Sequence, residues 1–392
     1  MIYLDNAATT RPLPEVVAAV RAVLEEDFGN PSSPHALGAA ARRILEDARR
    51  VVADALGVLP EHLVFTSGGT EANNLALFGA ARALRRTGRR IVSTRVEHPS
   101  VLRALEALAG EGFEVHLLGV DEEGFLSPEE VEKALSPETI LLSTIHVQNE
   151  VGSVQPLEEI ARVVRRHRER RGQPFVWHVD AVQSFCRLPL RPAVLGIDLL
   201  SLSAHKINGP KGVGALYIRP GTRVQPLLYG GEQEAGRRSG TENLPGIAGF
   251  GAAVRFWTER QKDLLDHLER LRTLFRERLS LIPGAVENSP RRGEGAPHLL
   301  HFSFPGLKGE VLVRALSERG VYVSSGSACA SRRREKSYVL QALGRSPEVV
   351  EGAVRFSLSP FLTEGEVEEA ARVVREAVAE LRSRSPLRVE GR

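Results

Sequence analysis

The sequence contains little cysteine, few lysines and no long apolar run. Its 392 residues include only two cysteines, Cys186 and Cys329, and no CxxC pair, which excludes a disulfide framework and a structural zinc site of the usual spacing. No stretch approaches the roughly 18 consecutive apolar residues that a membrane span needs, and the start, MIYLDNAATT, lacks the basic and apolar regions of a secretory signal. We therefore expect a cytoplasmic protein that does not enter membranes.

The charges of the chain nearly balance. There are 52 basic residues against 49 acidic ones, which gives a net charge of +3, and this argues against a dedicated nucleic-acid binder. Apolar residues make up 42% of the chain, as in ordinary globular proteins. Only six of the basic residues are lysines, so a lysine within a motif stands out.

Short apolar runs alternate with helical patterns through the first two thirds of the chain. One helical pattern begins at Ser127-Pro128-Glu129-Glu130, which supplies an N-cap, a proline in the first turn and an acid at the third helical position. Strands that alternate with helices predict a mostly parallel sheet covered on both faces, and we expect an α/β fold with seven strands in this sheet. The expected strands are His62–Thr66, Arg90–Thr94, Glu114–Leu118, Thr139–Val147, Phe175–Asp180, Asp198–Ser203 and Gly212–Ile218.

The last third of the chain has a different pattern. Thr222 to Gly246 is rich in glycine and turn residues, and a long helical stretch follows over Phe250–Ile282. Beyond it we expect two isolated strands and an amphipathic helix that starts with a capping box. We predict a large α/β domain over residues 13–255 and a smaller α+β domain over residues 1–12 and 256–392. The expected isolated strands are Leu299–Phe304 and Ala353–Leu358, and the expected helix is Thr363–Arg382.

A glycine-rich turn follows the first expected strand of the sheet. The residues SGGTEANN, Ser67 to Asn74, allow a tight turn that opens a helix, and free N–H groups at a helix start bind phosphate well. The motif matches neither GxGxxG nor a P-loop, so neither a dinucleotide nor ATP is indicated. An ordinary capped helix start remains the alternative interpretation.

Two charged residues follow other expected strands, where open α/β sheets bind their ligands. Asp180 ends a buried strand, and a carboxylate there needs a cationic or protonated partner such as a pyridinium nitrogen. Lys206 follows another strand in SAHKINGPKG, and a partly buried lysine can form a Schiff base with an aldehyde. A phosphate cradle, an acid for a ring nitrogen and a lysine for an aldehyde together predict pyridoxal 5′-phosphate.

At this point the chain resembles the cysteine desulfurases, which belong to the class V branch of the fold-type I pyridoxal-phosphate superfamily. The similarity extends from Tyr3 to about Pro386, and the order and spacing of its motifs are specific. The matching segments are Tyr3–Thr10, Phe28–Ser33, Phe65–Asn74, Glu97–Val101, His146–Gly152, His178–Ser184, Ser203–Gly212, Arg237–Asn243, Ser324–Ser331 and Val354–Leu358.

The resemblance implies a role for each matching residue. Lys206 would bind the cofactor covalently and then move protons at the substrate α-carbon, and Asp180 would keep the ring nitrogen protonated. His98 would stack on the ring and act as an acid or base near the sulfur. The other implied contacts are Gln183 with the ring hydroxyl, Gly69, Thr70, Ser203 and His205 with the phosphate, Thr241 with the phosphate of a second subunit in a homodimer, Asn149 with cofactor and substrate, and Arg355 with the substrate carboxylate.

Cys329 decides which reaction the resemblance implies. It lies in SSGSACAS, a run of small residues within a loop of about 324–337, and a nucleophile that must visit a buried substrate needs such a loop. A small buried thiol is the alternative for Cys329, and it is our interpretation of Cys186. L-cysteine would give L-alanine and a persulfide on Cys329, which a sulfur-acceptor or iron–sulfur scaffold protein would take. No resident metal is expected, although this persulfide could share an iron–sulfur cluster.

Other functions remain open as alternatives. A selenocysteine lyase or a related aminotransferase would use the same cofactor, but transamination needs no thiol. A catalytically silent scaffold protein would not need Lys206, Asp180 and Cys329 together. The run Arg332–Arg334 departs from the small neutral residues associated with this stretch. A solvated loop face explains it most simply, and a docking patch for an acidic acceptor is the alternative.

Overall fold

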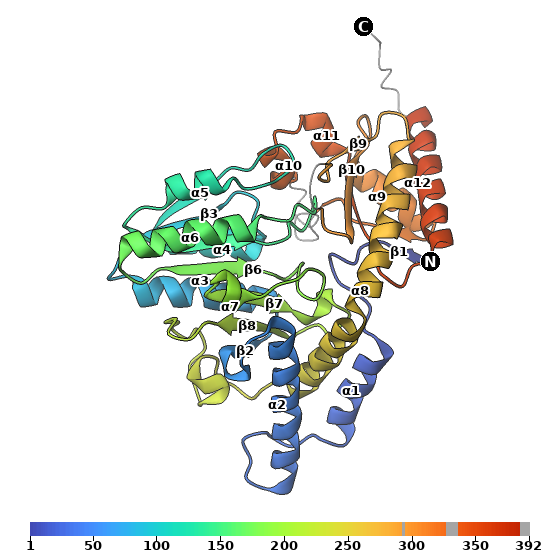
Figure 1. The fold of residues 1–392 in the computed structure, drawn as a ribbon. Coiled ribbons are helices and arrows are strands. Elements are labelled where there is room, and N and C mark those ends of the chain that lie inside the picture. The colour runs from blue at the N-terminus through green and yellow to red at the C-terminus, as the bar shows by residue number, and fades with distance from the viewer. Residues whose placement is uncertain (292–294, 327–335, 385–392) are drawn as a thin grey trace.

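A seven-stranded sheet forms the centre of the larger lobe (Figure 1). The computed structural model describes residues 1–291, 295–326 and 336–384. The strands of the sheet are β2 (Leu63–Thr66), β3 (Arg90–Thr94), β4 (Glu114–Leu118), β5 (Thr139–Ile145), β6 (Val176–Asp180), β7 (Leu199–Ser203) and β8 (Gly214–Ile218). Their order is β2-β8-β7-β6-β5-β3-β4, and β8 is the strand that runs antiparallel to its neighbours. The predicted α/β fold is confirmed, and each strand lies within two residues of its expected ends.

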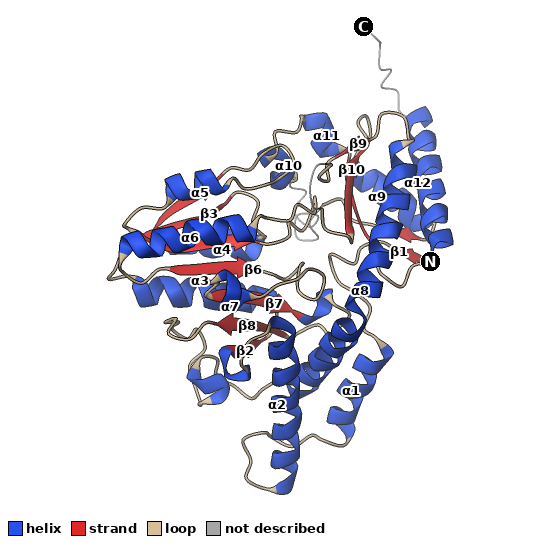
Figure 2. Ribbon diagram, in the orientation of Figure 1, coloured by secondary structure: helices blue, strands red, loops and turns tan. Residues whose placement is uncertain are grey.

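Helices cover both faces of this sheet (Figure 2). Successive strand residues point to opposite faces: Leu141 packs in one apolar cluster with α3 and α4, whereas Leu142 packs in another with α6. Ser127 caps α5 as expected, because its hydroxyl accepts from the Glu130 N–H. These helices are α3 (Gly69–Leu84), α4 (Pro99–Gly110), α5 (Pro128–Ala134), α6 (Leu157–Arg171) and the short α7 (Pro192–Leu195).

A long helix, α8 (Leu244–Ser280), runs from the larger lobe into the smaller one (Figure 1). It begins six residues before the predicted Phe250, because Asn243 caps it by accepting from the Gly246 N–H and Pro245 occupies its first turn. Its 37 residues span about 55 Å. It packs against α1 (Pro14–Glu25) and α2 (Ala36–Leu56), and later against α12 (Glu364–Arg384). The described part of the larger lobe also contains the 3-10 turns η1 (Pro60–His62), η2 (Ala204–Lys206) and η3 (Gln233–Gly236).

The smaller lobe contains two small sheets. The two strands expected to be isolated, found as β10 (Leu299–Ser303) and β12 (Ala353–Ser357), instead pair antiparallel with each other. That expectation was wrong because the paired residues lie fifty or more positions apart, and local sequence does not show such pairing. Thr363 and Glu366 form the predicted capping box of α12. The other elements are β9 (Val286–Glu287), which extends this sheet, β1 (Ile2–Tyr3), which pairs with β11 (Val321–Tyr322), and α9 (Gly309–Glu318), α10 (Tyr338–Ala342) and α11 (Pro347–Glu351).

The division of the chain into domains stays a prediction. Helix α8 continues through the expected boundary at residues 255 and 256. The predicted smaller domain includes residues 1–12, and strand β1, which lies in this range, pairs with β11 of the smaller lobe. Within the described ranges, none of the helices combines the length and the apolar character needed to cross a membrane.

Candidate active site

The predicted site residues meet at one edge of the large sheet. The parallel strands β3, β5, β6 and β7 all end there, so the residues that follow them converge. A cavity of about 230 Å³ lies at this edge. Thr241 is exposed and does not line this cavity within one chain. The cavity is lined by the ten other described residues that the sequence singled out: Gly69, Thr70, His98, Asn149, Asp180, Gln183, Ser203, His205, Lys206 and Arg355.

The start of α3 forms an anion cradle. Gly68, with a φ of +149°, takes a backbone conformation that favours glycine, and the first N–H groups of α3 have no partners within the helix. A Cβ added at Gly69 would lie 2.6 Å from Cγ2 of Val182, so only glycine leaves this space open. The buried Ser203 hydroxyl has no hydrogen-bond partner among the described residues. These features fit a phosphate group.

Asp180 lines the cavity and is only 3% exposed. Burial raises the pKa of its carboxyl group, whereas hydrogen bonds from the Val182 N–H and the Asn73 amide oppose the rise. The Asn73 Nδ2 donates to Oδ2 at 2.8 Å and the Val182 N donates to Oδ1 at 3.0 Å. A buried carboxylate held in this way fits a protonated ring nitrogen.

Lys206 ends the η2 turn, and its amine faces the cavity. Its Nζ donates to the carbonyl oxygens of Ala7 at 2.5 Å and Ala8 at 2.8 Å. Burial, followed by the charges of Arg355 and Arg187, lowers the pKa of this amine to about 7. A substantial fraction is therefore unprotonated near neutral pH, which is the form that attacks an aldehyde.

His98 caps the start of α4. Its Nδ1 accepts from the Ser100 backbone N–H at 3.1 Å and lies 2.8 Å from the Ser100 hydroxyl. Because Nδ1 accepts, we assign the ring proton to Nε2. Burial, with the positive charges of Lys206 and Arg355, lowers the pKa of His98 to about 4. The ring is thus neutral and retains one N–H donor.

Arg355 of β12 brings a buried positive charge to the cavity from the smaller lobe. It is 2% exposed, and its Nη2 pairs with the Asp5 carboxylate at 2.9 Å. Its Nη1 donates to the Asn149 carbonyl at 2.9 Å, and its Nε has no partner among the described residues. A guanidinium fixed in this way is suited to bind a small carboxylate.

Sequence reasoning missed several residues of the site. Asn73 and Ser100 lie within matching motifs but received no role, and the Ala7 and Ala8 carbonyls that hold Lys206 have no side-chain signal. Asp5 pairs with a residue 350 positions away. Arg187 contacts both Gln183 and the Lys206 backbone, which no local pattern indicates.

Cys329 and the run Arg332–Arg334 lie outside the described residues. The described chain on one side of them contacts Arg355, which lines the cavity, and on the other side it contacts Glu150, the neighbour of a lining residue. Ser324 exchanges two backbone hydrogen bonds with Arg355, at 2.7 and 3.2 Å. Ser337 donates its hydroxyl proton to Glu150, the neighbour of Asn149, at 2.6 Å.

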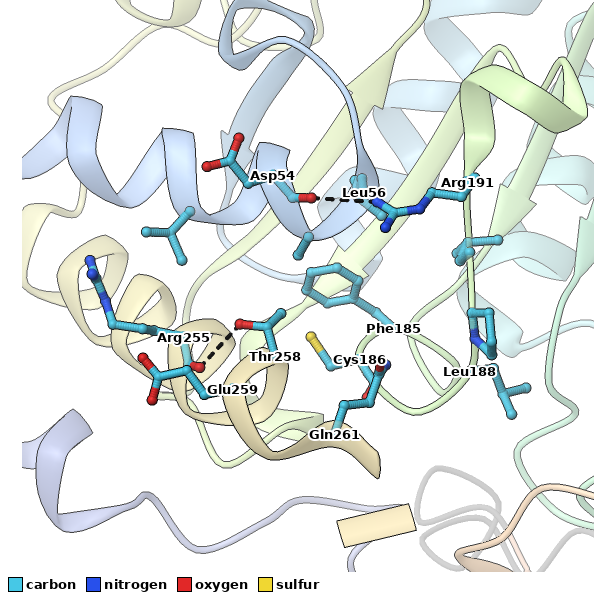
Figure 3. A pocket seen from close by; sticks show the side chains of 14 residues that line it. Asp54, Leu56, Phe185, Cys186, Leu188, Arg191, Arg255, Thr258, Glu259 and Gln261 are labelled. Atoms are coloured by element: carbon cyan, nitrogen blue, oxygen red, sulfur yellow. Dashed lines mark hydrogen bonds between the residues drawn. The ribbon is translucent and has the colours of Figure 1, made fainter. Parts of the chain in front are cut away.

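Cys186 lies outside the candidate active-site cavity. It borders a cavity of about 440 Å³ between α2, α8 and the segment after β6, and Figure 3 shows its sulfur among Phe185, Thr258 and Gln261. The residue is 5% exposed and belongs to the apolar core, as its structural interpretation requires. Burial raises the pKa of its thiol well above the usual range, so the reactive thiolate is disfavoured.

Comparison with known proteins agrees with this geometry. Residues 2–369 match the family model described as aminotransferase class-V. A protein of Dictyoglomus turgidum named cysteine desulfurase IscS is 41% identical over 390 residues, which cover 99% of this chain and 97% of that protein. A solved NifS-like protein superimposes with a TM-score of 0.90 at 37% identity and covers 97% of this chain and 99% of its own. A structure titled SspA in complex with cysteine has a TM-score of 0.80 at 33% identity, with 93% of this chain and all of that chain covered. The chain belongs to the class-V aminotransferase family and, within it, to the cysteine desulfurases.

Proposed function

We propose that the cavity removes sulfur from free L-cysteine, that L-alanine is released, and that Cys329 receives the sulfur as a persulfide. One observation carries this proposal: a single 230 Å³ cavity collects Lys206, Asp180, His98 and Arg355 from both lobes. The pKa of the Lys206 amine is lowered to about 7 and that of His98 to about 4, which supports an unprotonated amine and a neutral imidazole near neutral pH. The cysteine complex of the related SspA supports the choice of substrate.

The cofactor is pyridoxal 5′-phosphate, which withdraws electrons from the substrate α-carbon when bound. We propose that Lys206 holds it covalently, that Asp180 pairs with its ring nitrogen and that His98 packs on its ring. The unpartnered Ser203 hydroxyl and the space at Gly69 support a phosphate there. The remaining proposed contacts are Thr70 and His205 with the phosphate, Gln183 with the ring hydroxyl, Asn149 with cofactor and substrate, and Thr241 of the partner subunit with the phosphate.

Lys206 and Arg355 prepare the substrate in this proposal. The unprotonated amine of Lys206 takes the α-proton, and the carbonyl oxygens of Ala7 and Ala8 accept from the ammonium that results. Arg355 holds the substrate carboxylate while Asp5 fixes its guanidinium from the other side. Both contacts orient the α-carbon toward Lys206, which lowers the entropic cost of proton transfer.

The sulfur transfer needs a thiolate and a proton donor. The Cys329 thiolate attacks the substrate sulfur, so that an S–S bond forms while the carbon–sulfur bond breaks. The electron pair of the broken bond stays with the carbon, which takes up one proton to become the methyl group of alanine. His98, neutral with a proton on Nε2, is placed to move a proton between these groups.

The cellular setting is part of the same proposal. We propose a cytoplasmic homodimer, because the phosphate contact of Thr241 requires a second subunit. A sulfur-acceptor or iron–sulfur scaffold protein would take the persulfide from Cys329. A selenocysteine lyase or an aminotransferase remains the alternative activity of the same cavity.

The deciding experiment replaces Cys329 by serine. The Cys329→Ser protein is expected to keep the yellow colour of bound cofactor but to release neither alanine nor sulfide from cysteine. Cys186→Ala, which removes the other thiol, is the matched control and is expected to keep both products. Alanine release from cysteine by Cys329→Ser would contradict the proposal, and absence of turnover by the unaltered protein would favour a silent scaffold.

A further inference from the structure

Arg187 is a buried cation behind the active-site lysine. It is 2% exposed and lies in the segment between β6 and α7. Its Nη2 donates to the Lys206 carbonyl oxygen, its Nη1 lies 3.2 Å from His298 Nε2, and its guanidinium lies 5.8 Å from the centre of the Trp257 ring. Within the described ranges, no carboxylate forms an ion pair with it.

A buried charge without a counter-ion is costly, by several kcal/mol in proteins. Such a residue persists when the working protein supplies the missing negative charge. The ring oxygen of pyridoxal phosphate is anionic when the cofactor is joined to a lysine, and Arg187 lies just behind the two residues proposed to contact that end of the cofactor.

Arg187 also determines which way the Gln183 amide points. Arginine has only N–H donors, and the Arg187 Nη1 lies 3.3 Å from Oε1 of Gln183. The carbonyl of the amide must therefore face Arg187, which leaves Nε2 on the other side. One N–H of Nε2 bonds the Ala7 carbonyl at 2.9 Å, and the second is left to donate into the cavity that Gln183 lines.

We propose that Arg187 is a positioning residue for the cofactor ring: it fixes the Gln183 amide as a donor and places a positive charge behind Lys206. The inference rests on the proposed function in one respect, because it takes Gln183 and Lys206 to be contacts of the cofactor. Arg187 does not line the cavity and touches no reacting atom, so it acts through these two neighbours.

Other charged groups also act on the Lys206 nitrogen. Burial, then Arg355 and then Arg187 lower the pKa of the amine, whereas Asp5 and Asp180 raise it. The surrounding histidines are uncharged near neutral pH, because burial lowers the pKa of His98 to about 4, that of His205 to about 3 and that of His298 well below its usual value. Removing Arg187 therefore leaves Arg355 as the arginine that lowers the pKa of this nitrogen. The pKa rises, and the protonated form becomes more favourable.

The test is a pH titration of the holoenzyme, followed by the absorbance of the lysine-bound cofactor. Arg187→Gln is expected to raise the midpoint of this titration by about one pH unit. Arg187→Lys keeps the positive charge and is expected to restore a midpoint close to that of the unaltered enzyme. Arg272→Gln removes another buried arginine, which bonds the Leu299 carbonyl and not the cofactor contacts, and is expected to leave the midpoint unchanged.

Arg187→Met provides a second test should the glutamine variant not fold. Because it removes an unpaired buried charge, the apoprotein is expected to melt no lower than the unaltered apoprotein, while the rise in melting temperature on adding cofactor is expected to shrink. The proposal is overturned if Arg187→Gln titrates like the unaltered enzyme, or if Arg187→Lys moves the midpoint as far as Arg187→Gln does. Neither readout involves Cys329 or alanine release, so failure here is distinct from failure of the proposed function.

Discussion

Asn73 holds the two groups that would face the cofactor ring. Its Nδ2 donates to Asp180 Oδ2 at 2.8 Å and to the Ser100 hydroxyl at 2.9 Å, and Ser100 in turn contacts His98. We predict that Asn73→Leu weakens the binding of pyridoxal phosphate, and that the loss grows as the pH falls. The reason is that only the carboxylate form of Asp180 can pair with a protonated ring nitrogen.

The size of this effect follows from the hydrogen bond that is lost. A hydrogen bond to a charged group contributes about 1.5–3 kcal/mol, and each pKa unit corresponds to about 1.4 kcal/mol. Loss of the Asn73 contact should therefore raise the pKa of Asp180, which burial has already raised, still further. Below that pKa the carboxyl must lose a proton on binding, so affinity falls about 10–100-fold. Above the pKa of Asp180 the carboxyl group is already ionised, so no proton has to be lost on binding and this cause of weaker affinity disappears.

The assay is a fluorescence titration of the apoprotein with pyridoxal phosphate at a series of pH values, from above neutral down to the lowest pH at which the apoprotein stays folded. The unaltered protein is titrated at each pH, so that protonation of the free cofactor cancels in the ratio. Asn74→Leu is the matched control, since the Asn74 amide donates to the Thr70 carbonyl and not to Asp180. An affinity ratio that stays the same at every pH in this series would refute the reasoning.

Two more predictions follow from the same cavity. Because the pKa of Lys206 is lowered to about 7, the rate at which the apoprotein attaches cofactor should rise as the pH increases through about 7, which stopped-flow absorbance can follow; a flat rate would contradict this. Gly69→Ala should weaken cofactor binding by about 1–3 kcal/mol, since its Cβ would lie 2.6 Å from Val182 Cγ2. Adding Val182→Ala should recover part of that loss in the same binding titration, and no recovery would mean that the clash is not the cause.

The strands and helices of the larger lobe could be predicted because their signals are local. Short segments rich in apolar residues between turns were enough to place β2 to β8 within two residues. The order of the strands in the sheet depends on long-range pairing, and no local pattern contains it. The pairing of β10 with β12 was missed for this reason, and the early start of α8 depended on how Asn243 caps the helix.

The residues of the site also divide into those that a local sequence pattern indicates and those that only the folded structure brings into contact. Asp180, Ser203 and Lys206 could be singled out because each follows or ends a strand, and parallel strands deliver their ends to one edge. Asn73 and Asp5 act through contacts with residues that lie far from them in sequence, and Arg187 reaches the Lys206 backbone as well as its near neighbour Gln183. The roles of the individual residues stay predictions, and the Cys329 segment lies outside the described chain.

The segment Tyr3–Thr10 suggests why a lysine at this position can both take and return a proton. Its Ala7 and Ala8 carbonyls accept from the Lys206 amine, and the charge of Asp5 acts in the same direction; both favour the ammonium. Burial and the two arginines favour the neutral amine. Because the influences that favour the neutral amine outweigh those that favour the ammonium, the pKa of the amine falls from its usual 10.5 to about 7, where general acid–base catalysis works best at neutral pH. The same segment also pairs with Arg355 through Asp5, so the backbone that tunes the lysine is tied to the residue proposed to hold the substrate.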